Sequence, residues 1–439
     1  MEGGRVHKRG RAGMLALLRY LGRMVSEIIE LRGHIIDSLI LPKVLDEILM
    51  HGGNFKIKEI KIGQNRVNQS YACIEVTAPK HEALDDIVLR LRQHGAEVME
   101  KADAQLAAAP ADGVFPTDFY VTTNQQTFVR IGGKEIEVLP TIMDSGIVVD
   151  RKAGRASTAK FYEIRRGMEV VVGHQGIKVA PMQRATSRTD IFEFMANNIS
   201  VERPKSAIIR EIAREVQRAR ESGGKILVVA GSAVVQTGAS EHLEKMIEWG
   251  YVDLLFGGNA LAVHDVENVL FGTSLGVNLD QVALTSLGHA NQMRAINTVR
   301  AAGGIACAVK KGVLKDGLMA TCVRRGIDFV LAGSIRDQGP LPEVITDAVE
   351  AQKAMREKIG GVTIALMMST MLHSIAVGSL LPAGVKTLWV DISPGAISKL
   401  TDRGTFQALG LVTDIEPFLR ELTGCLESLR ASEKSSAKS

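Results

Sequence analysis

Six apolar segments between residues 225 and 392 constrain the fold of this chain more than any other feature. Each segment is a nearly continuous run of Val, Ile, Leu, Ala and similar residues, and helical segments separate most of them. Strands that are apolar on both faces are typical of a parallel sheet covered by helices on both sides. We therefore predict a doubly wound α/β domain with a parallel sheet. The candidate strands are 225–231, 251–258, 303–309, 327–333, 362–368 and 386–392.

The N-terminal half of the chain has a different pattern. From His34 to about Met99 the order of expected elements is βαββαβ, which predicts a ferredoxin-like module with helices on one face of a small sheet. Such a module can be a scaffold, a small-molecule sensor or a dimerisation unit. The Ala-rich stretch 104–113 is interpreted as a linker, and short β segments follow it. These segments are 119–123, 127–133, 134–139, 146–150 and 168–173.

These patterns divide the chain of 439 residues into parts, because a single core rarely grows beyond about 250–300 residues. We expect three folded domains, with a basic extension before them and a disordered polar tail after them. The expected bounds are 1–30 for the extension, 31–103 for the ferredoxin-like module, 104–195 for the β-rich middle domain, 196–430 for the Rossmann-like domain and 431–439 for the tail.

Charge and cysteine content exclude several classes of protein. The 53 basic and 49 acidic side chains are too evenly balanced to indicate a nucleic-acid or membrane partner. No apolar run reaches the roughly 18–20 residues that span a bilayer. The four cysteines lie far apart without a CxxC pair, which indicates no metal site and no disulfide framework. We expect a cytoplasmic protein with reduced thiols.

The segment from 362 to 392 has the order strand, turn, helix, strand that a dinucleotide site requires. Free N–H groups at the helix N-terminus would hold the pyrophosphate, and a carboxylate about 20 residues later would bind the ribose. Thr370 and Asp391 are 21 residues apart, which meets this spacing. The GxGxxG fingerprint is absent, so an ordinary βαβ unit in which Asp391 caps the next turn remains the alternative.

Other polar turns follow the expected strands of the same domain. They lie at the carboxyl ends of the strands, and this edge of an open parallel sheet is where ligands bind. Asn259 and Ala260 offer an amide and a backbone N–H, and Asp337 offers a carboxylate. His264 and His289 are acid/base candidates near neutral pH, with a surface or capping role as the alternative. The polar segments 122–124 and 143–146 either face a ligand or cap turns.

Several long segments of the chain are distinctive: ELRGHIIDSLILPKVLDEI, DGVFPTDFYVTTNQQTFVR, GSAVVQTGA, GGNALAVHD, LAGSIRDQGPLPEVITDA, TMLHSIAVGSLLP and VDISPGAISKL. Together they resemble the NAD-dependent ornithine cyclodeaminases of archaea and a similar unit fused to an arginine-degrading domain in cyanobacteria. The resemblance implies a C-terminal NAD-binding domain like that of deoxyhypusine synthase. It places the cofactor at Asn259, Ala260, Asp337, Thr370, Met371, Leu372, His373, Asp391 and Ile392.

The resemblance implies the conversion of L-ornithine to L-proline and ammonia by a redox-neutral hydride cycle on tightly bound NAD. Our hypothesis puts Asn124 and Arg130 at the substrate carboxylate, with Asp144 or His289 as the acid/base. A carboxylate at Asp391 would repel a 2′-phosphate and so favours NAD over NADP. We expect a homo-oligomer. The alternatives are a saccharopine-type dehydrogenase and a non-catalytic protein that senses NAD and an amino acid.

Overall fold

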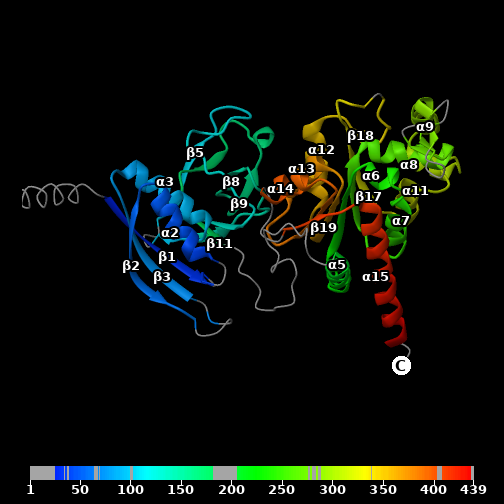
Figure 1. The fold of residues 1–439 in the computed structure, drawn as a ribbon. Helices are drawn as coiled ribbons and strands as arrows, with labels where there is room; N and C mark the ends of the chain where they lie inside the picture. Colours follow the sequence, from blue (N-terminus) through cyan, green and yellow to red (C-terminus); the bar gives the residue numbers. More distant parts are fainter. Residues whose placement is uncertain are drawn as a thin grey trace, which may run out of the picture. The chain divides into compact units, whose positions relative to one another are not determined.

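The structure is a computed structural model in which the chain forms two compact units, Met1–Ser187 and Arg188–Ser439 (Figure 1). It describes residues 25–33, 35–36, 39–63, 68, 70–98, 102–180, 205–274, 277–278, 283–284, 288–337, 339–402 and 408–436. Among the helices of this described part, none is both long and apolar enough to cross a bilayer.

The first unit begins with a four-stranded antiparallel sheet in the order β2-β3-β1-β4. Every second residue of β3 is buried, and the apolar sides of the two helices pack in the same core. This topology is the ferredoxin-like arrangement that the βαββαβ order predicted. The elements are β1 (Val25–Gly33), α2 (Ile40–Met50), β2 (Asn54–Lys61), β3 (Ser70–Ala78), α3 (His81–Gln93) and β4 (Glu97–Val98).

The first strand lies earlier in the chain than we predicted. β1 ends at Gly33, whereas the expected strand began at His34, and part of the expected basic extension is strand. Ile35 and Ile36 instead form a turn before α2. The Leu41 N–H in the first turn of that helix donates to the Ile35 carbonyl at 2.9 Å. The strand itself contains Ser26, Glu27, Glu30 and Arg32, whereas Ile35 and Ile36 follow it, so apolar content alone favoured the later segment.

The rest of the first unit forms two small antiparallel sheets with the orders β5-β10-β8-β9 and β11-β6-β7. The expected linker contains β5, which pairs with β10, while 119–123 forms no strand and only Phe119 bridges to Val172. The strands are β5 (Gln105–Ala108), β6 (Gln126–Ile131), β7 (Lys134–Glu137), β8 (Gly146–Asp150), β9 (Arg155–Ala159), β10 (Glu169–Val172) and β11 (Ile177–Ala180).

The second unit is built on a seven-stranded parallel sheet, which confirms the predicted fold class. Its order is β18-β17-β13-β12-β19-β20-β21. The strands are β12 (Lys225–Ala230), β13 (Leu254–Gly258), β17 (Asp328–Ala332), β18 (Val344–Ile345), β19 (Val362–Met368), β20 (Lys386–Asp391) and β21 (Ala408–Val412). A separate small sheet contains β14 (Thr273–Ser274), β15 (Val277–Asn278) and β16 (Ala283–Leu284).

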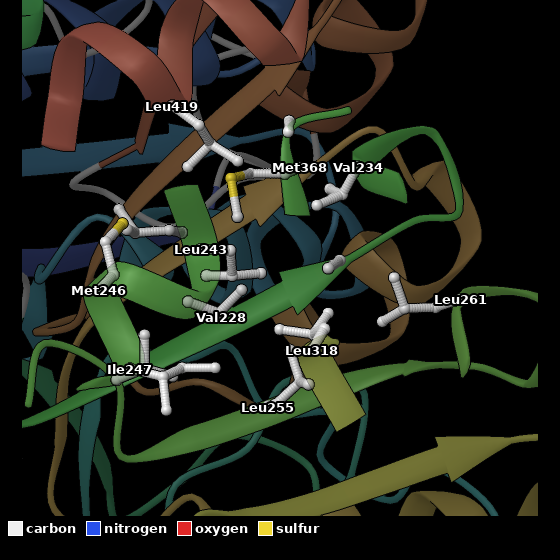
Figure 2. Packing of buried hydrophobic residues seen from close by; sticks show 14 of the residues in the cluster. Val228, Val234, Leu243, Met246, Ile247, Leu255, Leu261, Leu318, Met368 and Leu419 are labelled. Atoms are coloured by element: carbon white, nitrogen blue, oxygen red, sulfur yellow. The ribbon is translucent and has the colours of Figure 1, made fainter. Parts of the chain in front are cut away.

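Helices cover both faces of the large sheet (Figure 1). On one face Val228 of β12 and Leu255 of β13 pack with Leu243 of α7 and Leu419 of α15, as Figure 2 shows. On the other face, Gly378 of α13 lies against Trp389 of β20. The helices are α5 (Lys205–Glu221), α6 (Ala233–Gln236), α7 (Ser240–Glu248), α8 (Asn259–Phe271), α9 (Gly288–Ala302), α10 (Ile305–Lys310), α11 (Leu318–Arg325), α12 (Ala348–Lys358), α13 (Met371–Leu380), α14 (Pro394–Asp402) and α15 (Ile415–Ser436).

Two predictions in this unit were wrong. Residues 303–309 were expected to form a strand, but α10 begins at Ile305, whose N–H is bound by the Glu343 carboxylate at 2.5 Å. An acidic group at a helix N-terminus stabilises the helix, and a short apolar run does not by itself distinguish helix from strand. The tail was expected to be disordered from residue 431, yet α15 continues to Ser436.

Candidate functional site

The strand order reverses between β12 and β19, and this is the point where open α/β sheets bind ligands. Two turns meet there at the carboxyl ends of the strands. The Gly231 N–H after β12 donates to the Met368 carbonyl of β19 at 2.9 Å. A Cβ at position 231 would lie 2.0 Å from the Ser369 carbonyl oxygen, so only glycine fits. The switch point is therefore a close contact of two backbones.

The turn after β19 leads into the N-terminus of α13. Ser369 has a φ of +50°, and its buried Oγ has no hydrogen-bond partner among the described residues. Thr370 is the extended N-cap residue, and its side chain does not cap the helix, because it pairs instead with His373 Nδ1 at 3.0 Å. The first N–H groups of α13 thus have no side-chain cap. Such a terminus, beside an unpaired hydroxyl, fits the pyrophosphate of a dinucleotide.

His373 connects α13 with two neighbouring strand ends. A Cβ at Gly258, the N-cap of α8 after β13, would lie 3.0 Å from His373 Cε1. Burial lowers the pKa of His373, and the negative charge of Asp337, which follows β17, opposes that shift. The imidazole is therefore mainly neutral at pH 7, with its Nδ1 engaged by Thr370.

Asn259, Ala260 and Asp337 follow β13 and β17 at the same edge of the sheet. Asn259 is buried at the start of α8, and its Oδ1 accepts the Leu341 N–H at 3.1 Å, which leaves the amide N–H₂ as its donor. Ala260 is exposed in the first turn of α8. Asp337 Oδ2 accepts the Ser334 N–H at 2.7 Å and so fixes the loop that carries it.

Asp391 ends β20, the strand next to β19. Its Oδ1 accepts the Ser393 N–H at 2.8 Å, so this carboxylate does cap the following turn, as the alternative interpretation held. No described residue is bonded to its Oδ2. The neighbouring apolar side chains are largely exposed, with Leu372 at 74% and Ile392 at 71%, and Met371 is also exposed. A turn cap and a ribose contact are compatible at this position.

The cofactor candidates thus lie along one edge of the sheet, at the ends of β13, β17, β19 and β20. With strands about 4.8 Å apart, the four intervals from β17 to β20 span roughly 19 Å, which suits an elongated ligand. Our sequence interpretation did not include Gly231, Gly258 or Ser369 among the cofactor positions. The repeated Ala-Gly-Ser at 230–232 and 332–334 was an available signal, since both copies end a strand of this sheet.

His264 does not lie at this edge. It is buried in α8, with Nδ1 3.2 Å from Glu267 Oε2. Glu267 Oε1 accepts the Thr273 hydroxyl at 2.9 Å, and Asn291 of α9 donates to Thr273 at 3.1 Å. This buried network joins two helices and β14, so a structural role explains His264. His289 is the second residue of α9, and its side chain lies outside the described part of the chain.

In the first unit the fold brings together the two polar segments that the sequence singled out. The Thr122 hydroxyl donates to the Ile142 carbonyl at 2.5 Å and accepts the Ser145 N–H at 3.2 Å. The Asp144 N–H donates to the Thr122 carbonyl at 3.0 Å. Asp144 itself is exposed, with a φ of +55°. Asn124, two residues after Thr122, is only 7% exposed, and no described residue bonds its side chain.

The structure does not bring Arg130 to the same place as Asn124. Arg130 lies four residues along β6 from Gln126, which corresponds to about 13 Å of strand. Its Nε is 3.4 Å from Asp103 Oδ1. The two residues therefore do not form one carboxylate clamp, because the extended strand separates them.

Three family models match consecutive parts of the chain. Residues 26–125 match the "LOR/SDH bifunctional enzyme conserved region", 126–209 match "Arginine dihydrolase ArgZ-like, C-terminal, first region", and 210–422 match "Arginine dihydrolase ArgZ-like, C-terminal, Rossmann fold". The last match coincides with the seven-stranded sheet and most of its helices.

Among known proteins, an ornithine cyclodeaminase of Methanopyrus kandleri is 50% identical over 93% of this chain and 99% of its own length. The apo structure of ArgZ, an arginine dihydrolase of cyanobacteria, has a TM-score of 0.81 at 36% identity, over 93% of this chain and 59% of that one. AgrE in ternary complex with ornithine and NAD⁺ has a TM-score of 0.51 at 39% identity, with the same coverage. This chain thus spans about three fifths of the cyanobacterial proteins. It belongs to the ornithine cyclodeaminase family that includes the archaeal enzymes and the C-terminal region of ArgZ.

Proposed function

We propose that this protein is an NAD-dependent ornithine cyclodeaminase that converts L-ornithine to L-proline and ammonia. The observation that carries the proposal is the switch-point edge, where an uncapped helix N-terminus, a buried unpaired serine hydroxyl and an acidic strand end lie on adjacent strands. Similarity to an ornithine cyclodeaminase over 99% of that protein's length supports the reaction.

The residues at this edge fit a dinucleotide. Backbone N–H groups from Met371 to His373 would hold the pyrophosphate, and Asp391 would bind a ribose hydroxyl. Asn259, Ala260 and Asp337 would contact the other half of the cofactor. Bound NAD would supply hydride acceptance and donation, which makes the net reaction redox-neutral. The chain's own task is to hold the cofactor between the two steps.

The substrate residues would come from the turn around Thr122. Asn124 is only 7% exposed, and no described residue bonds its side-chain amide, so the amide is open to a ligand. We propose that it binds the ornithine carboxylate, and that exposed Asp144 moves protons between the two substrate amines. Arg130 would not contact the ornithine carboxylate directly, because its guanidinium pairs with Asp103. His289 is the second candidate for proton transfer.

The test is to incubate the purified protein with L-ornithine and a catalytic amount of NAD⁺, and to follow proline, ammonia and NADH absorbance. Equal amounts of proline and ammonia without net NADH support the proposal. Asp391→Asn is expected to slow the reaction at low NAD⁺. The matched control is Asp328→Asn. Asp328 is an exposed residue at the start of β17, so it lies at the amino ends of the strands, away from the proposed cofactor site.

A saccharopine-type dehydrogenase is the second candidate, because residues 26–125 match the conserved LOR/SDH region. A dehydrogenase accumulates NADH in proportion to product, whereas a cyclodeaminase does not. Binding of NAD without turnover of any amino acid would favour the third candidate, a non-catalytic protein that senses NAD and an amino acid. We further propose a cytoplasmic homo-oligomer, in keeping with four free cysteines, and light scattering tests the oligomeric state.

A further inference from the structure

The turn that carries Asp144 adopts a conformation that its own sequence does not favour. Asp144 has a φ of +55°, in the left-handed region that non-glycine residues enter infrequently, although Asp tolerates it better than most. Residues in such conformations persist where the surroundings over-determine them, and they concentrate at functional sites. The groups that hold this turn therefore determine where the Asp144 side chain points.

One of these groups is Lys160, a cation that is far from Asp144 in sequence. β8 and β9 form a hairpin in which Gly146 pairs with Ala159, so Lys160 follows the strand directly beside the turn. Its Nζ donates to the Met143 carbonyl at 2.7 Å and to the Asp144 carbonyl at 3.1 Å. Charge-assisted hydrogen bonds are about twice as strong as neutral ones. Lys160 thus clamps both peptide groups that flank the Asp144 Cα.

The opposite side of the turn is held by Thr122, whose hydroxyl contacts Ile142 and Ser145. The Lys160 backbone is fixed in turn, because its N–H donates to Glu163 Oε2 at 2.8 Å. The turn is consequently held from two sides, while the Asp144 side chain remains exposed and no described residue bonds its carboxylate.

We propose that Lys160 is a positioning residue that sets the direction of the Asp144 carboxylate for proton transfer. This inference rests on the proposed function, since it takes Asp144 as the acid/base of the cyclodeaminase reaction. The ammonium acts through the Asp144 backbone and does not itself contact substrate. Misplacing a reacting group by about 1 Å can cost roughly 100-fold in rate.

The experiment is a double-mutant cycle on the full-length protein with NAD⁺, measuring kcat and KM for ornithine. Lys160→Met is expected to lower kcat about 100-fold with KM nearly unchanged, and Lys160→Arg to restore most of the loss, because a guanidinium can donate to the same carbonyls. In an Asp144→Asn background, Lys160→Met should cause little further loss, because coupled residues are not additive. Lys152→Met, at the closed end of the same hairpin, is the matched control.

Additive losses in the cycle, or an unchanged kcat in Lys160→Met, would overturn the inference. Retained NAD binding and an unchanged melting temperature separate lost positioning from unfolding. If Lys160→Met does not fold, Lys160→Gln takes its place in the cycle, since it keeps a neutral donor. A wild-type protein that forms no proline refutes the proposed function itself, whereas an active wild type with additive variants refutes only the role of Lys160.

Discussion

The edge of the seven-stranded sheet and the Asp144 turn are both candidate sites, but different parts of the polypeptide hold them. At the sheet edge, backbone groups meet backbone groups, as where Gly231 approaches the Ser369 carbonyl. In the turn, the side chains of Thr122 and Lys160 reach across to carbonyl groups. A backbone-held site depends on the whole sheet, whereas a side-chain-held site depends on a few residues. Variants should therefore act differently in the two regions.

The largest effect on stability is expected from the buried network that joins α8, α9 and β14. Glu267→Ala removes the hydrogen-bond partner of His264 and the acceptor of Thr273, and each buried group left unsatisfied costs about 1–3 kcal/mol. Urea unfolding followed by circular dichroism measures the loss. Glu241→Ala, an exposed carboxylate on α7, serves as the control. Equal stability of the two variants would show that the network does not support the second unit.

The largest effect on ligand binding is expected from Gly231→Ala. The added methyl group would overlap the Ser369 carbonyl and push the two turns apart, and we expect NAD binding to weaken at least about 100-fold, or roughly 2.7 kcal/mol. Calorimetric titration with NAD⁺ gives the affinity. Gly360→Ala is the control, because nothing lies within 4 Å of the added carbon. Normal affinity in Gly231→Ala would remove the switch point from the cofactor site.

Thr122→Val tests the side-chain-held region. The valine keeps the shape but loses the hydrogen bonds of the hydroxyl to Ile142 and Ser145. The loss releases the Asp144 turn, and misplacing a reacting group by about 1 Å can cost roughly 100-fold in rate, so kcat/KM for ornithine should fall about 10- to 100-fold. NAD affinity should stay the same. Steady-state kinetics and NAD⁺ titration together decide the matter, and a parallel loss of NAD binding would contradict the division into two kinds of site.

A smaller effect is expected from Asp391→Asn. The substitution keeps an acceptor for the Ser393 N–H but removes the charge offered to a ribose, so NAD should bind about 10-fold more weakly. Discrimination against NADP should also decrease, since the repulsion of a 2′-phosphate is lost. Competition of the two nucleotides for the protein measures both. Unchanged affinity and selectivity would leave Asp391 as a turn cap only.

The smallest effect is on the pH dependence of stability. Burial, and then the charge of Asp265, raise the pKa of Glu244 from 4.5 to about 7. Because the folded-state pKa is the higher one, this group stabilises the fold below pH 4.5, and the contribution is lost as the pH rises through 7. Glu244→Gln should therefore flatten the change in melting temperature between pH 5 and 8. Glu241→Gln should leave the wild-type slope, and an identical slope in both variants would refute the assignment.

Much of the second unit could be predicted from the sequence. Continuous apolar runs set β12, β13, β17, β19 and β20, because a strand buried on both faces has no polar alternation. The spacing of Thr370 and Asp391 pointed to one strand–helix–strand unit, and the structure has that unit. The local sequence pattern predicted the wrong element where an apolar segment is bound by a residue that is distant in the sequence. The segment at α10 became a helix because Glu343, which lies 38 residues away, binds its first N–H.

Only the tertiary structure decided which polar turns meet. The sequence by itself determined that polar residues follow several strands, but not that β12 and β19 are neighbours, since strand order depends on how the crossover helices pack. It also could not show that Lys160 reaches the Asp144 turn or that Arg130 points to Asp103. The physical reason is the same in each case. Composition and periodicity act over a few residues, whereas these contacts join residues that only the folded sheets bring together.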